Sequence, residues 1–575
     1  MTRDVRIERI LWGVALVLGV SPLWATSELP LVDLPQHLHL ISVLHRLDDP
    51  STLFPELFAR RPELTPYLGY YYLVSLLNWL LPLELANRVF LTAYVAGLPL
   101  ALAFLLRSVK RPSWPALLAV PFAYGDSFAW GFINYVSALP LTLLTCGLFV
   151  RTIQDAANRR RWAIGLGVSL VAVLLFHVQA FAYLGVALPF LLLTTKGELA
   201  GRKAAVFGVL PGVVTFIAWV GLRLGQPAEI APGQPWKSWG PLLSKENLAW
   251  KPFEANRAEL VPTLSNMLPD GSDRFAVLAA VLVAAFGVLA SVWKLELKQS
   301  VLKPVAIVAA PALFTLWSRA SSAPNEPLAT SLLEAWSPWV LPVMIAVLAG
   351  GAALSWLRPS DEGEAPVERL RLLGLALIAL VLFFALPFDI RGYMYYLNTR
   401  YAHLAAPLAL ASVPAVLAAN RRVMLVGAAL VAGLAGLMLS RGFSRFDDEA
   451  KQLTSLVAYA GPKPRVMGLV YQTGSRAVTH PVYLHASTVL ARLNGGVTNF
   501  SFALTPHSPV MYRGAPPPTF PSEWRPDQMS WESQGRWYDH FIVRGAHPRQ
   551  ILGQLLDSEL YVAGQAGDFF LVKKR

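Results

Sequence analysis

Cysteine is nearly absent from this sequence: the only one, Cys146, stands inside a long apolar run. A single cysteine excludes an intrachain disulfide and a metal site built from several thiolates. The C-terminal part of the chain also has no Gly-rich phosphate loop, no His/Cys cluster and no nucleophile elbow. The C-terminal part of the chain therefore lacks the motifs of nucleotide-binding, zinc-binding and hydrolase domains.

Charged residues are also scarce, at 15% of the 575 residues, whereas 55% are hydrophobic. The apolar residues fall into blocks of about 16–23 residues, which as helices would cross about 30 Å of hydrocarbon. Such blocks must be helical, because a spanning segment has to satisfy its own backbone hydrogen bonds. The composition excludes a soluble globular protein and predicts a polytopic α-helical membrane protein.

The net charge of +13 comes from 49 basic and 36 acidic residues. In a membrane protein, Lys and Arg collect in cytoplasmic loops, so we expect no nucleic-acid partner. Arg3, Arg6 and Arg9 precede the first apolar run, which predicts a cytoplasmic N-terminus and an uncleaved first helix.

The basic clusters all fall on the cytoplasmic side if an even number of spans separates successive clusters. This rule predicts about thirteen spans and an extracytoplasmic C-terminus. The apolar segment Tyr67–Leu81 is short, and we expect it to lie at the outer interface without crossing. The predicted spans are 10–26, 84–106, 113–125, 135–150, 162–176, 178–195, 203–222, 274–293, 304–318, 335–357, 371–387, 401–419 and 423–440.

Two domains follow from this pattern. Residues 1–440 form a transmembrane domain with outer loops at about 27–66 and 224–273, and residues 441–575 form a soluble extracytoplasmic α/β domain. Periodicity in the second domain predicts helices and strands around a Pro-rich loop, Thr505–Pro526. The predicted elements are the helices Asp448–Tyr459, His480–Leu493 and Gln550–Leu556, the strands Arg465–Gln472 and His540–Arg544, and the hairpin Leu560–Lys574.

Asp33 and His37 stand in the first outer loop, a few residues after the first span. One interpretation makes Asp33 the N-cap of an amphipathic interfacial helix. The functional interpretation makes it a general base, or a contact to a metal or hydroxyl, beside the His37 imidazole. Neither residue type is favoured next to hydrocarbon without a reason, so both are candidate catalytic residues.

Polar residues also occur at two tight outer turns. Asp126 and Asn134 flank an aromatic, Gly-containing turn, and His177 and Gln179 separate two long apolar runs. An interfacial aromatic belt or a hydrogen bond to a neighbouring helix would explain them without a function. As substrate-binding residues, they would contribute donors and acceptors on the same face as Asp33.

Two arginines, Arg391 and Arg400, lie on the predicted outer side, against the charge rule, among tyrosines that include Tyr395. Snorkelling arginines in an aromatic belt are one explanation. The planar guanidinium also binds phosphate oxygens in a bidentate manner, so these residues are candidate contacts to a lipid phosphate.

Together these features resemble the GT-C superfamily of membrane glycosyltransferases, which includes protein O-mannosyltransferases and aminoarabinose transferases. Asp33 matches the acidic position of the first outer loop, 66–81 matches the interfacial helices, and Arg400 matches a late phosphate-contacting Arg. The Asp-Glu pair of many members is absent, since Leu34 follows Asp33.

The resemblance implies transfer of a sugar from a polyprenyl-phosphate donor to an extracytoplasmic acceptor. Asp33 would act on the acceptor hydroxyl, and Arg400 or Arg391 would hold the leaving phosphate. Membrane lipid is then a partner, in a location such as a bacterial inner membrane. No cofactor is identified; a divalent cation stays open, and no residue pattern requires one. A transporter or flippase of a lipid-linked substrate and a non-catalytic envelope scaffold are the alternatives.

Overall fold

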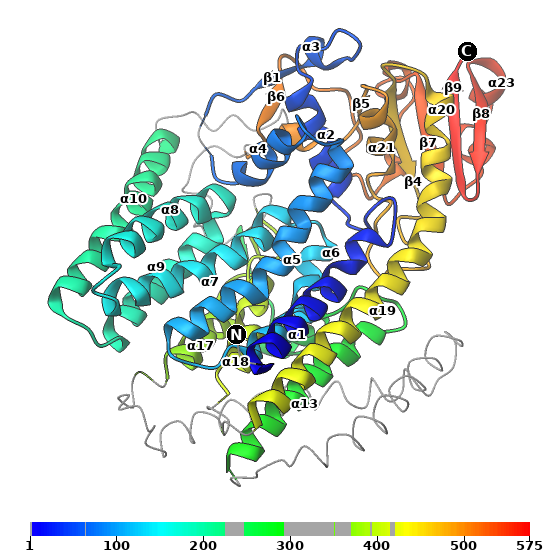
Figure 1. The fold of residues 1–575 in the computed structure, drawn as a ribbon. Helices are drawn as coiled ribbons and strands as arrows, with labels where there is room; N and C mark the ends of the chain where they lie inside the picture. The colour runs from blue at the N-terminus through cyan, green and yellow to red at the C-terminus, as the bar shows by residue number, and fades with distance from the viewer. Residues whose placement is uncertain are drawn as a thin grey trace.

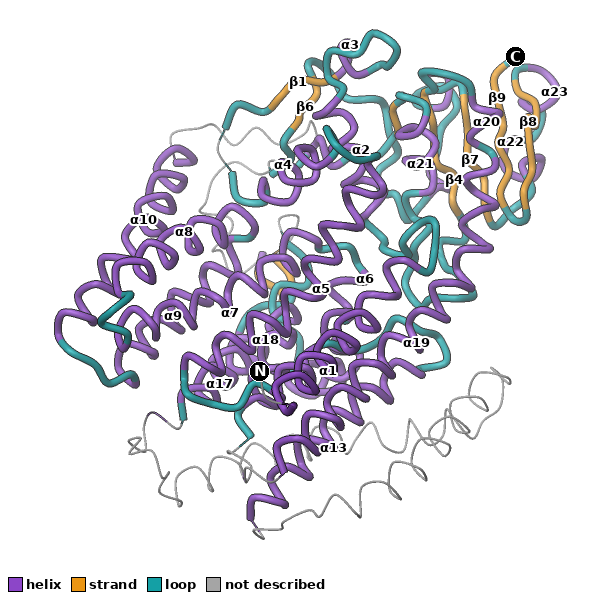
Figure 2. The backbone as a smooth tube through the Cα atoms, viewed as in Figure 1, coloured by secondary structure: helices purple, strands orange, loops and turns teal. Residues whose placement is uncertain are grey.

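Long helices pack side by side over most of the molecule, and a five-stranded sheet lies at one end (Figure 1) (Figure 2). The structure is a computed structural model. It describes residues 3–63, 65–224, 247–292, 350, 368, 370–390, 394–413, 420–505 and 507–575. The predicted span 304–318, nearly all of 335–357 and the candidate residue Arg391 lie outside the described residues.

Most predicted spans within the described ranges have an α-helix at their place. Several of these helices expose large apolar side chains, such as Phe207, Val214 and Ile217, which is favourable only where hydrocarbon rather than water surrounds them. The helices are α1 Arg3–Val20, α5 Leu83–Ser108, α7 Ile133–Gln154, α8 Arg159–Phe176, α9 Val178–Thr194, α10 Leu199–Leu224, α13 Ser272–Val292, α17 Arg371–Ala385, α18 Ala402–Ala411 and α19 Arg421–Ser455.

Five helices among the described residues are long and apolar enough to cross a membrane. The chain is therefore an integral membrane protein. Others, such as α9 with 17 residues and α17 with 15, are shorter. The total of thirteen spans thus stays a prediction. The five are Val5–Trp24, Leu83–Ser108, Ile133–Gln154, Leu199–Leu222 and Arg421–Ala460.

The predicted span 113–125 is not an α-helix. It consists of two 3-10 helices, η2 Trp114–Ala119 and η3 Pro121–Tyr124, each with a proline in its first turn. Proline lacks the backbone N–H and its ring clashes with the preceding turn, which disfavours one continuous α-helix through this segment. Because a 3-10 helix rises about 2 Å per residue, the segment, which is wholly buried, is longer than an α-helix of the same number of residues.

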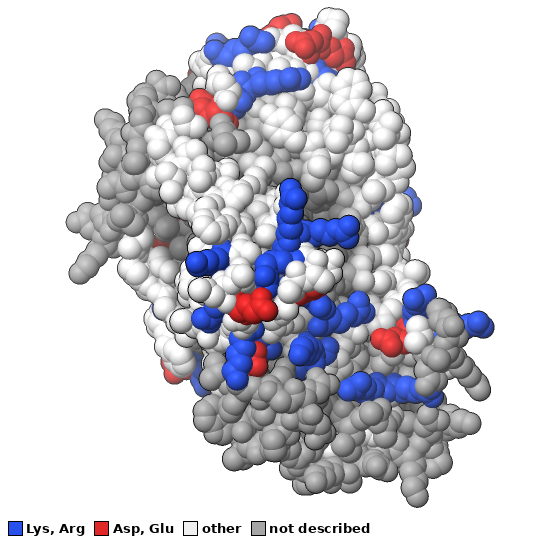
Figure 3. Space-filling view, turned by 60° about the vertical axis from the view of Figure 1, so that its left-hand side comes forward, with Lys and Arg blue, Asp and Glu red and all other residues white. Residues whose placement is uncertain are grey.

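Basic segments gather at one end of the helices. Arg151 donates to the carbonyl of Arg107 at 3.2 Å, and Arg159 pairs with Glu198 at 2.9 Å, which joins the ends of α5, α7, α8 and α10. On the face drawn in Figure 3, a patch rich in Lys and Arg is separated from the charges at the top by a broad uncharged band. A cluster of basic residues separated from other charges by an uncharged band is typical of loops on one side of a membrane.

The apolar segment after residue 66 forms a short helix, α4 Leu68–Leu77. At 1.5 Å per residue, its ten residues are about 15 Å long, which is half of what a span requires. The helix therefore does not cross on its own, as expected for an interfacial position.

The two segments predicted as outer loops contain structure of their own. In the first, α2 Leu34–His45 and α3 Phe54–Leu57 precede β1 Phe58–Arg60. Strand β1 pairs antiparallel with β6 Val510–Tyr512, so the Pro-rich stretch predicted as loop contains a strand. In the second, β2 Leu248–Ala249 pairs with β3 Asp389–Ile390, and α12 Phe253–Leu264 follows.

The C-terminal sheet has the order β5-β4-β7-β9-β8. Strands β5, β4 and β7 are parallel, whereas β9 is antiparallel to β7 and forms a hairpin with β8. The strands are β4 Arg465–Val470, β5 Val497–Thr498, β7 His540–Arg544, β8 Leu560–Ala566 and β9 Phe569–Lys574, with the helices α20 Val457–Ala460, α21 Ala486–Leu493, α22 Pro548–Leu552 and α23 Leu555–Ser558.

The structure differs from the predicted C-terminal elements at three places. Helix α19 continues to Ser455, so residue 440 lies inside a helix. The predicted helix His480–Leu493 starts at Ala486, because turns that include Pro481 precede it. The predicted helix Gln550–Leu556 divides into α22 and α23 at Gly553, whose φ of 52° ends the first helix.

Close packing of α1 against α19 depends on Gly436. A Cβ at this position would lie 1.9 Å from the Leu18 carbonyl oxygen. We expect Gly436→Ala to force the helices apart and lower stability by about 1–3 kcal/mol, measured as thermal unfolding in detergent. Gly427→Ala on the same helix is the control, because its Cβ would make an ordinary 3.6 Å contact. Equal melting temperatures for the two variants would contradict the prediction.

Candidate functional site

Asp33 lies at the start of α2, where the first outer loop meets the C-terminal region. Its backbone N–H donates to the Trp130 carbonyl at 3.0 Å, and its side chain makes no helix-capping hydrogen bond. Asp33 Oδ1 lies instead 3.4 Å from Nε2 of His485, the residue that precedes α21. Asp33 thus occupies the N-cap position of α2, as one interpretation predicted, but its side chain does not cap the helix. Helix α2 is also buried on nearly all sides, which excludes an interfacial helix with an exposed polar face.

His485 lies between two carboxylates, since its Nδ1 is 3.5 Å from Glu523 Oε2. Burial lowers the pKa of His485, but the charges of Glu523 and Asp33 outweigh burial and the net shift is upward. Burial raises the pKa of Glu523, and the charge of Asp33 adds to this rise. The three side chains form a carboxylate–imidazole–carboxylate row that can hold and pass on a proton.

His37 lies one helical turn after Asp33 in α2. Its Nε2 lies 3.1 Å from the Gly131 carbonyl, and its Nδ1 lies 2.7 Å from the Tyr71 hydroxyl. Burial lowers the pKa of His37 to about 4, more than the charge of Asp33 raises it. The ring is thus neutral near pH 7, with Nε2 as the donor to the carbonyl. Both nitrogens are engaged, and a catalytic role for His37 beside Asp33 stays a prediction.

The turn between Asp126 and Asn134 joins this site to the membrane helices. Asp126 Oδ1 lies 2.7 Å from His480 Nε2, and Asn134 accepts from the backbone N–H of Tyr70 at 3.4 Å. Gly131 has a φ of 85°, and a Cβ there would lie 2.9 Å from the backbone nitrogen of Asp33. Only glycine combines this conformation with such a close approach.

Arg400 is the centre of a second group. Its guanidinium lies 3.0 Å from His177 Nε2 and 3.5 Å from Gln179 Oε1, and it donates to the Tyr395 carbonyl at 3.2 Å. The side chain is buried, and its Nε has no hydrogen-bond partner in the described part of the chain. No described carboxylate forms an ion pair with it either. A buried cation without a counter-ion is unfavourable, so an anion bound here would be stabilised.

Aromatic rings connect the two groups. The Arg400 guanidinium lies 4.3 Å from the Phe132 ring centroid. The ring centroids of Trp130 and Tyr396 are 5.2 Å apart. Burial lowers the pKa of Arg400, while the charge of Asp33 is among those that act in the opposite direction. The charges of Asp33 and Arg400 thus act on each other across the aromatic turn.

Two of the four described non-glycine residues with a positive φ lie beside these groups. Tyr67 and Tyr396 have φ angles of 78° and 57°, which non-glycine residues rarely adopt. The Tyr67 ring lies 4.5 Å from the His177 ring, so both strained residues touch the site. Strain of this kind persists only where the surrounding structure enforces it, and it is common at functional sites.

The structure therefore brings some of the predicted residues together and separates others. His177, Gln179 and Arg400 meet directly, and Tyr395 contributes its carbonyl while its side chain is exposed. Asp126 contacts a histidine of the C-terminal region, and Asn134 binds only backbone. Within the described ranges, no group of three His, Cys, Asp or Glu side chains is arranged to hold a metal ion.

Sequence analysis missed His480, His485 and Glu523. The two histidines stand five residues apart where a helix was predicted to begin, and this spacing was the available signal. Glu523 lies in the Pro-rich stretch, and nothing in its local sequence distinguishes it from a solvent-exposed acid.

Comparisons with known proteins find no matching protein family and no matching curated protein. Solved structures do match. ArnT from Cupriavidus metallidurans bound to undecaprenyl phosphate is 13% identical, with a TM-score of 0.46 and coverage of 99% of this chain and 98% of that one. The mycobacterial arabinofuranosyltransferase AftD is 12% identical, with a TM-score of 0.47, and this chain covers 40% of it. Both are GT-C glycosyltransferases, the superfamily that the sequence resembles. At TM-scores below 0.5, these superpositions assign no chemistry to the chain.

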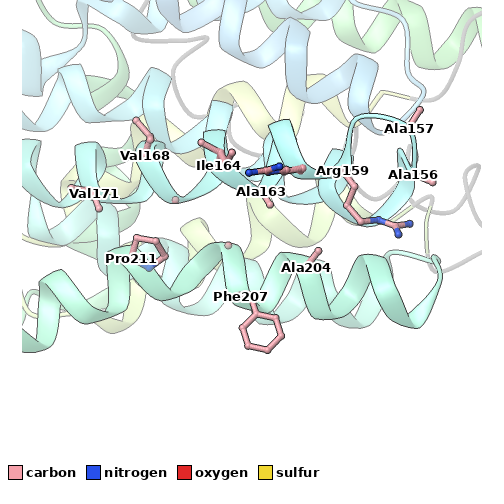
Figure 4. Close-up of a pocket in the computed structure, with 13 residues that line it drawn as sticks. Ala156, Ala157, Arg159, Ala163, Ile164, Val168, Val171, Ala204, Phe207 and Pro211 are labelled. Carbon is pink, nitrogen blue, oxygen red and sulfur yellow. The ribbon is translucent and has the colours of Figure 1, made fainter.

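A cavity of about 960 Å³ lies away from these groups. It is a mostly apolar groove between α8 and α10, with Ile164, Val168, Phe207 and Pro211 along it and Arg159 at one end (Figure 4). Exposed apolar side chains on both helices indicate that this groove faces the hydrocarbon of the membrane.

The raised pKa of His485 predicts a pH-dependent stability. A protonated histidine with a raised folded-state pKa stabilises the fold fully below its unfolded value of 6.5, and this contribution disappears as the pH rises through the folded value. The difference in melting temperature between the wild type and His485→Gln should therefore shrink as the pH is raised from 6 to 9. A difference that is constant or that grows with pH would contradict the prediction.

Proposed function

We propose that this chain is a membrane glycosyltransferase that transfers a sugar from a polyprenyl-phosphate donor to a hydroxyl group of an extracytoplasmic acceptor. One observation carries the proposal: the Arg400 guanidinium is buried, has a free Nε and lacks a carboxylate partner among the described residues. A phosphate would supply the missing negative charge and accept charge-assisted hydrogen bonds.

The chemistry follows from the two groups. Asp33 takes the proton of the acceptor hydroxyl while that oxygen forms a bond to the sugar C1. The bond between C1 and the phosphate oxygen breaks, and Arg400 stabilises the charge of the leaving lipid phosphate. His485 acts as a positioning residue, because it lies 3.4 Å from Asp33 Oδ1 and orients the carboxylate.

The orientation is part of the proposal. The basic ends of α5, α7, α8 and α10 lie together, which supports a cytoplasmic location for that end and for the N-terminus. Asp33, Arg400 and the C-terminal α/β domain would then lie on the extracytoplasmic side. The membrane itself would be a bacterial inner membrane. A polyprenyl chain would lie among the membrane helices with its phosphate at their outer ends.

Asp33→Asn tests the base. We expect turnover to fall by about 10²–10⁴-fold, because the amide cannot accept the proton, while the melting temperature stays close to that of the wild type. Asp48→Asn, an exposed position in the same loop, is the matched control and should retain activity. The measurement is sugar transfer from a radiolabelled polyprenyl-phosphate sugar by purified protein in nanodiscs. Unchanged transfer by Asp33→Asn would refute the role of this carboxylate, and a transporter or scaffold would then be favoured.

Arg400→Ala tests the phosphate contact. Loss of charge-assisted hydrogen bonds to a phosphate should weaken binding of undecaprenyl phosphate by about 10–100-fold. Arg400→Lys should recover part of this loss, since it keeps the charge but not the planar fork. Arg513→Ala removes an exposed arginine of the C-terminal region and should bind normally. Native mass spectrometry of the detergent-solubilised protein measures the bound fraction. Equal binding by Arg400→Ala and the wild type would exclude the contact.

A further inference from the structure

A second, polar cavity lies in the C-terminal region. It has a volume of about 360 Å³ and is separate from the Asp33 and Arg400 groups, because it shares no lining residue with them. Helix α19, the loop after β4, the end of β7 and the turn of the β8–β9 hairpin form its walls. Its main polar lining residues are Glu449, Gln452, Gln472, Arg476, Arg544 and Asp568.

The sheet topology explains why a cavity opens here. Strand β4 continues through α21 to β5 on one side, whereas β7, its parallel neighbour on the other side, continues through α22 and α23 to β8. The loops after β4 and β7 therefore leave in opposite directions. A crevice at the carboxyl ends of two such strands is the usual ligand site of open α/β sheets.

Arg544 forms the floor of this cavity. It is 4% exposed and donates to the carbonyls of Gln472 and Gly474. Its guanidinium lies over the rings of Tyr483 and Phe569, at 4.2 and 4.9 Å. The Nε has no partner among the described residues, and no described carboxylate pairs with the side chain. One buried donor is thus left for a ligand.

The lining chemistry is mixed. Two carboxylates, two carboxamides and two guanidinium groups face one small volume, so neither a simple anion nor a simple cation fits the balance of charge. A sugar hydroxyl donates one hydrogen bond and accepts others, which matches such a set of donors and acceptors. The volume has room for about one or two sugar rings.

We propose that this polar cavity of the C-terminal region is a saccharide-binding site, distinct from the site of sugar transfer. Gln472 and Arg476 line the rim, with exposed side chains, and Arg544 lies below them. Binding in this cavity requires no catalysis. It would hold one part of a glycan at the C-terminal region while the reacting end of that glycan lies outside the cavity.

The full-length protein in nanodiscs is applied to an array of neutral and uronic-acid-containing di- to tetrasaccharides, and affinities for the bound glycans are then measured by microscale thermophoresis. We expect the wild type to bind at least one class. Gln472→Ala and Arg476→Ala should each weaken that binding by about tenfold or more, because each removes hydrogen bonds at an exposed and structurally tolerant position. Gln554→Ala and Arg536→Ala, at exposed positions outside the cavity, are the matched controls and should bind as the wild type does.

The outcomes separate this proposal from the transferase proposal. Asp33→Asn should bind the glycan normally, whatever its effect on transfer. Absence of binding to every saccharide, or binding that Gln472→Ala and Arg476→Ala leave unchanged, would overturn the cavity proposal. Binding that is lost in Asp33→Asn but kept in both cavity variants would overturn it as well, because the glycan would then occupy the transfer site.

Discussion

Helix α2 buries Gln36, His37 and His39, and the position of the C-terminal region depends on satisfying these polar side chains. Gln36 donates to the Phe500 carbonyl at 2.9 Å, His39 contacts the Gly496 carbonyl at 3.1 Å, and His37 contacts Gly131. Leaving one such group buried without a partner costs about 1–3 kcal/mol. Because two of the partners come from the C-terminal region, that region cannot separate from the first loop without exposing or orphaning these groups.

Charged contacts support the same arrangement. Arg492 of α21 is buried and binds both Glu28 and Glu84, and His480 binds Asp126. These contacts hold α21 and the residues before it against the first residues of α5 and α6 (Asp126–Ala129) and the segment after α1, which is why His485 reaches Asp33. The carboxylate–imidazole–carboxylate row is therefore a consequence of docking and belongs to neither part alone.

The two halves of the candidate site carry opposite charge. On one side of the aromatic turn lie the Asp33 and Glu523 carboxylates, and on the other lies the Arg400 guanidinium, which pairs with no carboxylate in the described part of the chain. A transfer reaction that removes a proton from one oxygen and releases a phosphate on another needs this polarity, with groups fixed before the substrate arrives. Gly131 and the strained Tyr396 keep the turn between them compact.

Local patterns predicted a good part of the fold. Strand β7 has the predicted bounds, and α5 begins and ends within two residues of the predicted span. Hydropathy and alternation are properties of neighbouring residues, so they are visible in one dimension. Hydropathy predicted an α-helix for the segment 113–125, whereas the structure has two 3-10 helices there, each with a proline in its first turn. Strand β6 could not be predicted, since its partner β1 lies more than 400 positions earlier.

By itself, the sequence determined that the chain lies in a membrane, and it singled out Asp33, His177 and Arg400 as candidate site residues. Polar groups next to hydrocarbon are costly, and that cost is evident without coordinates. Only the tertiary structure decided what those residues face: His485 and Glu523 beside Asp33, no carboxylate beside Arg400 within the described ranges, and a crevice between β4 and β7. These contacts depend on which helix faces and strand ends meet across hundreds of residues, and no local pattern records that.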